Sequence, residues 1–389
     1  MRHHHHHVTK DVRMHNPKAA GEHHSVSPPD KPSHNHHHHE QQMKDMTICD
    51  GCNRQNIDSF YYQCEHCQDY ELCYKCRSRS VTTKFHTNTH RMIFLSDKIM
   101  PSIDINELEF KRELGRGAFG IAYKAYWPSR NRTVACKVIT VPVDIFTNDK
   151  EKSFFKEISA YSQISGHYIL KTYGYSQKIL ENGNREYVLV MEYMDKGSLT
   201  SLIHEKKEKL TFRKKLLIAC NIASGMRKIH DHQMIHRDIR PDNILIKQGY
   251  TAKIGDMGIA RIMSRSKQHT VIGYEPYMPL EFYTGIYDQK LDIFTFGLTL
   301  NELFTEILHD KHPNKRVIIT KQSPVFWDLI SNCIHDDPQR RPTALEVEIK
   351  LYKFKDSLTE MIKRTKDYNI FSHDKKNHFF VNYYEQRHL

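Results

Sequence analysis

A glycine-rich stretch and a lysine that follows it are the first residues whose types and spacing could do chemistry. Gly115, Gly117 and Gly120 follow the pattern Gly-x-Gly-x-x-Gly, whose missing Cβ atoms let the backbone approach phosphate oxygens. The pattern alone could equally open a dinucleotide-binding fold. Lys137 lies seventeen residues beyond Gly120, and a buried lysine needs a partner, which Glu157 could supply.

A second group consists of cysteines and histidines. Six of the nine cysteines fall within 28 residues as three Cys-x2-Cys pairs, and two histidines follow them. Each pair can present two thiolates to one ion, and a structural zinc ion takes four ligands. Eight ligands complete two sites, although the spacing does not say which pairs share an ion. Three unrelated reduced pairs are the alternative, which three pairs in succession disfavour. The candidate ligands are Cys49, Cys52, Cys64, Cys67, Cys73, Cys76, His86 and His90.

The elements that must position the phosphate-binding residues read as strands and a helix. Residues 121–125 alternate as a strand directly after the glycines, and residues 134–137 form a second strand. A strand at this point argues against a dinucleotide fold, in which a helix follows the glycines. Residues 153–161 carry apolar side chains at helical spacing, with Glu157 beside that stripe. From about residue 108 the sequence therefore predicts a mixed α/β domain.

Two later motifs complete the pattern. His236-Arg237-Asp238-Ile239-Arg240-Pro241-Asp242-Asn243 precedes the β-rich run 244–246, and Asp256 follows eighteen residues after Asp238. In this order and at these intervals, residues from roughly 108 to 350 resemble the protein kinase signature set. The resemblance implies an α+β, two-lobed protein kinase fold and a serine/threonine kinase that uses ATP and Mg²⁺.

The resemblance also implies a role for each matching residue. Lys137 would hold the α- and β-phosphates and pair with Glu157. Asp238 would orient the substrate hydroxyl and accept its proton, while Asn243 and Asp256 would hold Mg²⁺. The implied catalytic residues are Asp238, Lys137, Arg240 and Asn243. The implied ATP-binding residues are Leu114, Gly115, Arg116, Gly117, Ala118, Phe119, Gly120, Ala122, Ala135, Lys137, Glu157, Glu192, Met194, Asn243 and Asp256, with Met191 as gatekeeper.

The cysteine-rich segment resembles a ZZ-type zinc finger through Phe60-Tyr61-Tyr62-Gln63-Cys64 and Asp69-Tyr70-Glu71-Leu72-Cys73. That family is a cross-brace, which would place Cys49, Cys52, Cys73 and Cys76 on one ion and Cys64, Cys67, His86 and His90 on the other. His86 is the least secure ligand because its spacing to His90 is wide. ZZ fingers bind proteins or peptides, and Asp69 and Glu71 match their acidic positions. Ordinary surface carboxylates are the alternative.

Several positions depart from the usual kinase pattern. Arg240 replaces the usual lysine, and Tyr274 replaces the threonine of the peptide-docking loop. Both blur the choice between Ser/Thr and Tyr, although Pro241-Asp242-Asn243 favours Ser/Thr. Ala122 replaces valine and Met257 replaces phenylalanine. The alternatives are a dual-specificity or tyrosine kinase, or a weakly active scaffold whose zinc finger binds partners. Residues 222–226 and 333–338 most resemble the tyrosine-kinase-like group of serine/threonine kinases.

Other residues are predicted to support the fold. Glu281 should pair with Arg341, and Asp292 should brace the catalytic loop, as the resemblance implies. We expect buried thiols at Cys136, Cys220 and Cys333. Autophosphorylation is predicted at one of Ser264, Ser266 or Thr270.

Composition bounds the partners. The 389 residues carry a net charge of +12, with basic and acidic residues interleaved rather than clustered. This disfavours nucleic-acid binding, and the sequence has no apolar run of about 18 residues that predicts a membrane helix. Nothing resembles a secretory signal, so we expect a cytoplasmic protein, without excluding the nucleus. The expected partners are protein substrates and a peptide or protein ligand of the zinc finger.

Five segments are predicted along the chain. Thirteen of the 28 histidines lie in the first 40 residues, which have too few large apolar side chains to form a core. After about residue 355, aromatic residues occur among polar ones; disorder is the default expectation and docking on the kinase the alternative. The segments are a disordered His-rich tail (1–45), a small zinc-stabilised cross-brace finger (46–95), a linker (96–107), the kinase domain (108–355), and a helix end with a tail (356–389).

Overall fold

The computed structural model describes residues 47–388 except 56, 58, 59, 84, 85, 118, 119, 144–147, 165, 207 and 257–274. Several residues considered above lie outside this part of the chain: the His-rich tail, Ala118, Phe119, Met257, Ser264, Ser266, Thr270 and Tyr274.

The first described unit of structure is a small finger built on three short strands. β1 (Tyr61–Cys64) pairs antiparallel with both β2 (Glu71–Leu72) and β3 (Met92–Leu95), and helix α2 (Tyr74–Ser78) follows β2. Gly51 lies between the first two cysteines, where an added Cβ would come within 2.9 Å of Cys76 Sγ. The chain needs a glycine there because the two cysteine pairs approach so closely.

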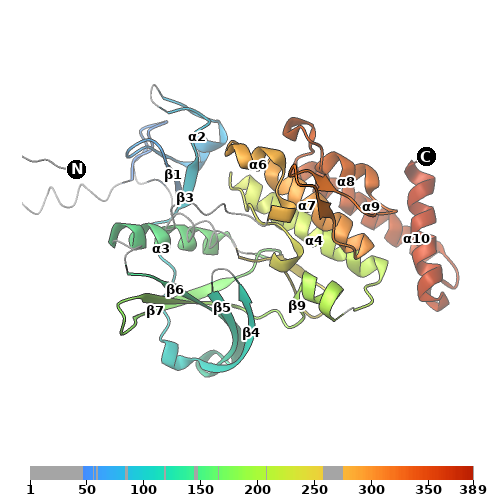
Figure 1. Cartoon of the computed structure of the whole chain (residues 1–389), viewed down its shortest axis with the longest axis horizontal. Helices are drawn as coiled ribbons and strands as arrows, with labels where there is room; N and C mark the ends of the chain where they lie inside the picture. Colours follow the sequence, from blue (N-terminus) through green and yellow to red (C-terminus); the bar gives the residue numbers. More distant parts are fainter. Residues whose placement is uncertain are drawn as a thin grey trace, which may run out of the picture. The chain divides into compact units, whose positions relative to one another are not determined.

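A five-stranded antiparallel sheet forms the smaller lobe of the next domain, in the order β4-β5-β6-β8-β7 (Figure 1). Its strands are β4 (Glu109–Gly117), β5 (Gly120–Trp127), β6 (Arg132–Val141), β7 (Thr172–Ile179) and β8 (Arg185–Glu192). Helix α3 (Asn148–Gln163) covers one face of this sheet. Phe154 and Phe155 of α3 contact Tyr187 and Tyr175, with ring centroids 5.2 and 4.4 Å apart. Phe154 of the predicted helical stripe therefore packs on the sheet, together with its neighbour Phe155.

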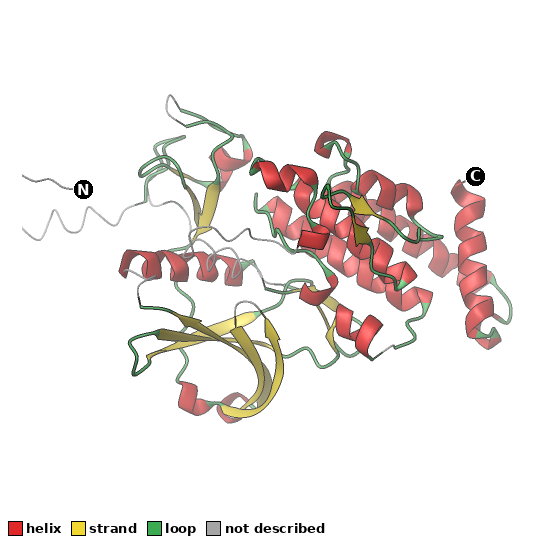
Figure 2. Ribbon diagram, viewed as in Figure 1, coloured by secondary structure: helices red, strands yellow, loops and turns green. Residues whose placement is uncertain are grey.

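The larger lobe is mostly helical (Figure 2). Its helices are α4 (Phe212–Asp231), α6 (Leu280–Thr284), α7 (Lys290–Thr305), α8 (Trp327–Cys333) and α9 (Ala344–Arg364), and its short strands are β9 (Gly197–Ser198), β10 (Ile244–Ile246), β11 (Ala252–Ile254), β12 (Asp310–Lys311) and β13 (Val317–Ile318). Thr343 and Glu346 form a capping box that starts α9. Cys136, Cys220 and Cys333 are fully buried, as expected. Among the described residues, no helix is long and apolar enough to cross a membrane.

The end of the chain differs from the default expectation of disorder. Residues His373–His388 form a helix, α10, and Phe380 on it is 1% exposed. The ring of Phe380 stacks on Phe212 of α4 with centroids 4.6 Å apart. Tyr384 lies 5.1 Å from the ring of Phe326. Tyr383 and Tyr384 follow Phe380 by three and four positions, so these three rings lie on one face of the helix and bury apolar area. The structure therefore agrees with the alternative expectation, in which the tail docks on the kinase domain.

Candidate active site

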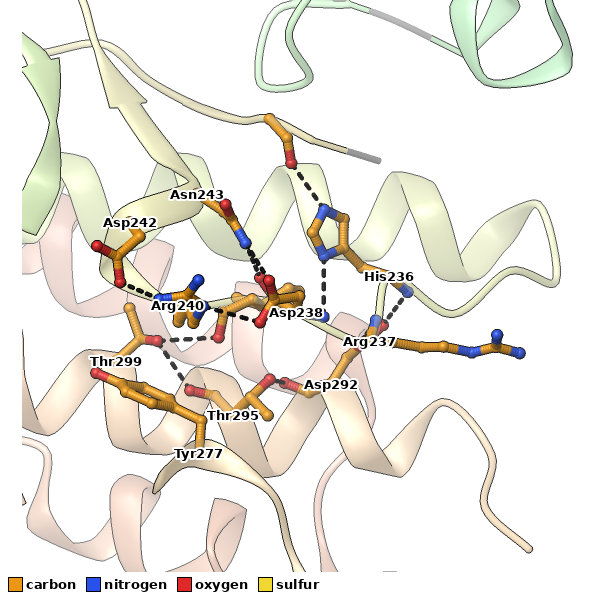
Figure 3. A network of polar contacts seen from close by, with 12 residues as sticks. His236, Arg237, Asp238, Arg240, Asp242, Asn243, Tyr277, Asp292, Thr295 and Thr299 are labelled. Atoms are coloured by element: carbon orange, nitrogen blue, oxygen red, sulfur yellow. Dashed lines mark hydrogen bonds and ion pairs between the residues drawn. The ribbon is translucent and has the colours of Figure 1, made fainter. Parts of the chain in front are cut away.

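Asp292, at the start of α7, holds the backbone that carries the catalytic motif (Figure 3). Its carboxylate is fully buried and accepts the backbone N–H groups of His236 and Arg237, at 2.8 and 2.7 Å. His230 Nε2 lies 2.9 Å from the same carboxylate. Burial alone would raise the pKa of Asp292, but the hydrogen bonds and the charge of His230 outweigh burial and lower it. The predicted brace is confirmed.

Two neighbouring side chains orient the Asp238 carboxylate. Arg240 Nε donates to Oδ1 at 2.9 Å, and Asn243 Nδ2 donates to Oδ2 at 2.6 Å (Figure 3). Arg240 also pairs with Asp242. Each carboxylate oxygen retains a second acceptor position, so a substrate hydroxyl could still donate to Asp238. Because Asn243 uses its amide nitrogen here, its amide oxygen remains available to a cation.

Lys137 and Asp256 bring the second half of the site together. Lys137 Nζ lies 2.8 Å from Asp256 Oδ1, so within the described part of the chain Lys137 forms its ion pair with Asp256. We expected Lys137 to pair with Glu157. Glu157, 1% exposed on α3, instead accepts a hydrogen bond from the Tyr161 hydroxyl at 2.7 Å. In the described part of the chain, Lys137 therefore pairs with Asp256, and Tyr161, one helical turn along α3, binds the Glu157 carboxylate.

The remaining candidate ATP-binding residues line the sheet and the segment between the lobes. Gly120 has a φ of +147°, and an added Cβ would collide with the carbonyl oxygen of Val138, so only glycine fits. Ala122 lies opposite Lys137 in the β5–β6 register, and Ala135 lies opposite Met191 between β6 and β8. A cavity of about 30 Å³ lies beside Met191 and Asp256.

Three further candidates lie at the edges of this region. Leu114 and Arg116 are exposed on β4, where Arg116 pairs with Glu113 at 2.9 Å. Glu192 pairs with Lys253 at 2.7 Å, so its side chain joins β8 to β11, and Met194 is buried nearby.

The eight zinc-ligand candidates form two groups. Within each group the ligand atoms lie within 4.8 Å of one another, and the groups are Cys49, Cys52, Cys73, Cys76 and Cys64, Cys67, His86, His90. Cys52 Sγ lies 4.0 Å from Cys73 Sγ, and Cys67 Sγ lies 3.7 and 3.2 Å from Nδ1 of His86 and His90. A tetrahedral zinc ion with ligands at about 2.0–2.3 Å needs ligand atoms roughly 3.3–3.8 Å apart. The residues present fit the metal, in the cross-brace pairing that the resemblance implies, and His86 belongs to it.

Two other expectations concern carboxylates. The Arg341 side chain is fully buried and pairs with Glu281 through both terminal guanidinium nitrogens, as predicted. In the finger, Asp69 is exposed at a positive φ of 51°, and Glu71 accepts a hydrogen bond from Gln63 at 3.3 Å. Asp69 is thus accessible to a ligand, whereas Glu71 is engaged within the sheet.

A contact between the finger and α3 leaves no motif in the sequence. Lys156 of α3 pairs with Asp97 at 2.6 Å and donates to the Tyr61 hydroxyl at 3.1 Å. Phe94 of β3 is 2% exposed, and its ring faces Tyr161 with centroids 6.4 Å apart. The finger therefore contacts α3, the helix that carries Glu157, and one of the contacting residues is Tyr161, whose hydroxyl donates to Glu157.

The finger also contacts the segment before the catalytic loop. The hydroxyls of Tyr62 and Tyr74 donate to the carbonyl oxygens of His232 and Asp231, at the end of α4. The short linker between the finger and the kinase domain is compatible with contact between them, but the sequence alone does not indicate which residues are in contact.

Comparison with known proteins agrees with both domains. The family described as "Protein kinase domain" matches residues 108–352, and the family described as "Zinc finger, ZZ type" matches residues 43–87. The chain is 30% identical over 269 residues to the dual specificity protein kinase shkB of Dictyostelium discoideum, covering 63% of this chain and 40% of that protein. It is 30% identical over 252 residues to the serine/threonine-protein kinase cst-1 of Caenorhabditis briggsae, covering 60% and 49%. It thus spans less than half the length of these relatives.

Proposed function

This chain belongs to the protein kinase family and carries a ZZ-type zinc finger, and from that premise we propose that it transfers the γ-phosphoryl group of ATP to serine and threonine hydroxyls of proteins. The observation that carries the proposal is the orientation of Asp238 by Arg240 and Asn243. A carboxylate fixed in this way can align a substrate hydroxyl and take its proton as the oxygen attacks phosphorus. Lys137 would meet the phosphate oxygens.

Magnesium fits the same site. The amide oxygen of Asn243 and the carboxylate of Asp256 are the hard oxygen ligands that Mg²⁺ prefers. Bound there, the ion would neutralise charge on the phosphates. The chain's own residues would position the nucleotide and the hydroxyl.

The activity is tested with purified full-length chain, Mg-ATP and a generic protein substrate. Asp238→Asn should abolish transfer, whereas Asp336→Asn, at an exposed aspartate of the larger lobe, should not. Equal activity in both variants would contradict the proposal. The similarity to a dual specificity kinase raises the question of residue preference, which phosphoamino-acid analysis of the product answers.

A weakly active scaffold is the second candidate, and the pairing of Lys137 with Asp256 favours it. In that case the nucleotide would have to displace an existing ion pair. Thermal-shift titration with Mg-ATP separates the two candidates, because binding to the native state raises the melting temperature. The scaffold predicts little or no shift.

For the finger we propose two structural zinc ions and a protein or peptide ligand with a basic group that meets Asp69. Elemental analysis of the purified chain should give two zinc ions per molecule. Cys52→Ser and His90→Ala should each lower this content, because the two residues belong to different ligand groups.

A further inference from the structure

A cavity of about 360 Å³ lies between the finger and the larger lobe, apart from the nucleotide site. Its lining includes Arg77 and Arg91 from the finger, and Arg237 and Lys290 from the larger lobe. Among the described residues of that lining, Asp288 is the only one with a carboxylate. The volume lies in the range of small-ligand sites, about 300–1,000 Å³, and four cationic side chains face one anionic one.

Arg77 is the residue that most clearly needs a ligand. Its Nε is buried without a hydrogen-bond partner, and its guanidinium makes no hydrogen bond or ion pair within the described part of the chain. Burying an uncompensated charge is costly, and such groups are normally paired. Arg77 cannot easily turn away, because the Tyr74 hydroxyl ties α2 to the end of α4 at 3.0 Å.

Other positive charges are brought to the same place. The guanidinium groups of Arg91 and Arg237 both lie over the ring of Tyr287, 5.0 and 5.6 Å from its centroid. Arg237 has a φ of +72°, and its side chain points away from Asp238 and Asn243 (Figure 3). Arg91 also donates to the Gly285 carbonyl at 2.6 Å, which holds the finger against the larger lobe. Like charges gathered in this way repel one another unless an anion lies between them.

We propose that this cavity binds a phosphate monoester, with the Arg77 guanidinium as its central contact and with Arg237 and Lys290 completing the site from the kinase side. A phosphoryl group carries close to two negative charges and three acceptor oxygens, which match the planar fork of arginine. A carboxylate carries one charge and suits this number of cations less well. The phosphate comes either from a phosphorylated residue of this chain or from another molecule.

The test uses full-length chain treated with phosphatase. Calorimetric titration at constant ionic strength measures binding of O-phospho-L-serine, with L-serine and L-glutamate as matched ligands. We expect binding of the phosphorylated ligand only, weakened about 10- to 100-fold by Arg77→Ala, the range for charge-assisted hydrogen bonds. Arg79→Ala is the control, because Arg79 is an exposed arginine two positions away that does not line the cavity. Arg77→Lys keeps the charge without the fork and should lose part of the affinity.

Folding of each variant is checked by its zinc content and its melting temperature. A second readout does not depend on the variants: inorganic phosphate should raise the melting temperature of the wild-type chain more than chloride at equal ionic strength, and this difference should vanish in Arg77→Ala. Equal affinity in Arg77→Ala and Arg79→Ala, or no binding by the wild-type chain, would overturn the proposal.

One further arm identifies the source of the phosphate. The chain is incubated with Mg-ATP, and its phosphorylation is confirmed by mass spectrometry before titration. Loss of O-phospho-L-serine binding in the phosphorylated chain supports an intramolecular source. Unchanged binding supports a phosphate carried by another molecule.

Discussion

Replacing Phe94 by alanine should loosen α3 from the finger, whereas removing the ion pair at the same contact should have little effect. Phe94 is 2% exposed and touches the rings of Phe60, Tyr62 and Tyr161. Truncating a buried phenylalanine costs about 3–5 kcal/mol. The side chains of Lys156 and Asp97 are 36% and 48% exposed, so their ion pair contributes about 0–1 kcal/mol. The hydrogen bond from Lys156 to the Tyr61 hydroxyl adds about 1 kcal/mol.

Amide hydrogen exchange of α3 in the full-length chain measures the difference between the Phe94 and Lys156 variants. If the finger protects α3, amides in residues 150–163 should exchange more than about 100-fold faster in Phe94→Ala, since a loss of about 3–5 kcal/mol corresponds to at least two factors of ten. The increase in Lys156→Ala should be about 30-fold or less, because the ion pair and the hydrogen bond together contribute about 1–2 kcal/mol. Amides of α9, remote from this contact, serve as an internal reference. Equal acceleration of α3 in the two variants would refute the view that apolar packing dominates the contact.

Three other predictions concern the larger lobe and the finger. Phe380→Ala should lower the free energy of unfolding by about 3–5 kcal/mol, measured by urea denaturation, and Phe379→Ala, at a partly exposed neighbour, should lower it less. Burial lowers the pKa of His309 below 6.5, so this residue contributes stability above that pH and loses it as the pH falls; the wild-type chain should lose more stability between pH 7 and pH 5 than His309→Gln. A zinc chelator should unfold the finger and speed exchange in α3 even without any substitution; unchanged α3 exchange in metal-free chain would contradict this.

The parts of the site that the sequence predicted are those with fixed local spacing. The run from His236 to Asn243 folds on itself, so Asp238, Arg240 and Asn243 meet through contacts between near neighbours. The brace from Asp292 was predictable only through the family resemblance, because it joins residues more than fifty positions apart. The sharing of zinc ligands likewise came from the resemblance, since the spacing left the pairing open.

The other features of the site depend on tertiary contacts, which produce no periodic pattern or motif in the sequence. Glu157 lies where it was expected, on the buried side of α3, yet spacing cannot say that Tyr161 would engage it. The contact of Phe94 with α3 joins the apolar residues of the finger and those of the kinase domain into one continuous core. Arg77 reads as an ordinary surface arginine until the fold places it beside a cavity.

Helix α10 has a consequence for where the catalytic domain ends. The family match stops at residue 352, inside α9, whereas the aromatic packing continues to Tyr384. A chain truncated at 352 would lay open Phe212 and Phe326, which now lie under α10. Exposed aromatic patches of this kind promote self-association. Poor solubility of such a fragment would therefore result from the loss of this cover rather than from a defective kinase fold, because the packing of the larger lobe continues to Tyr384.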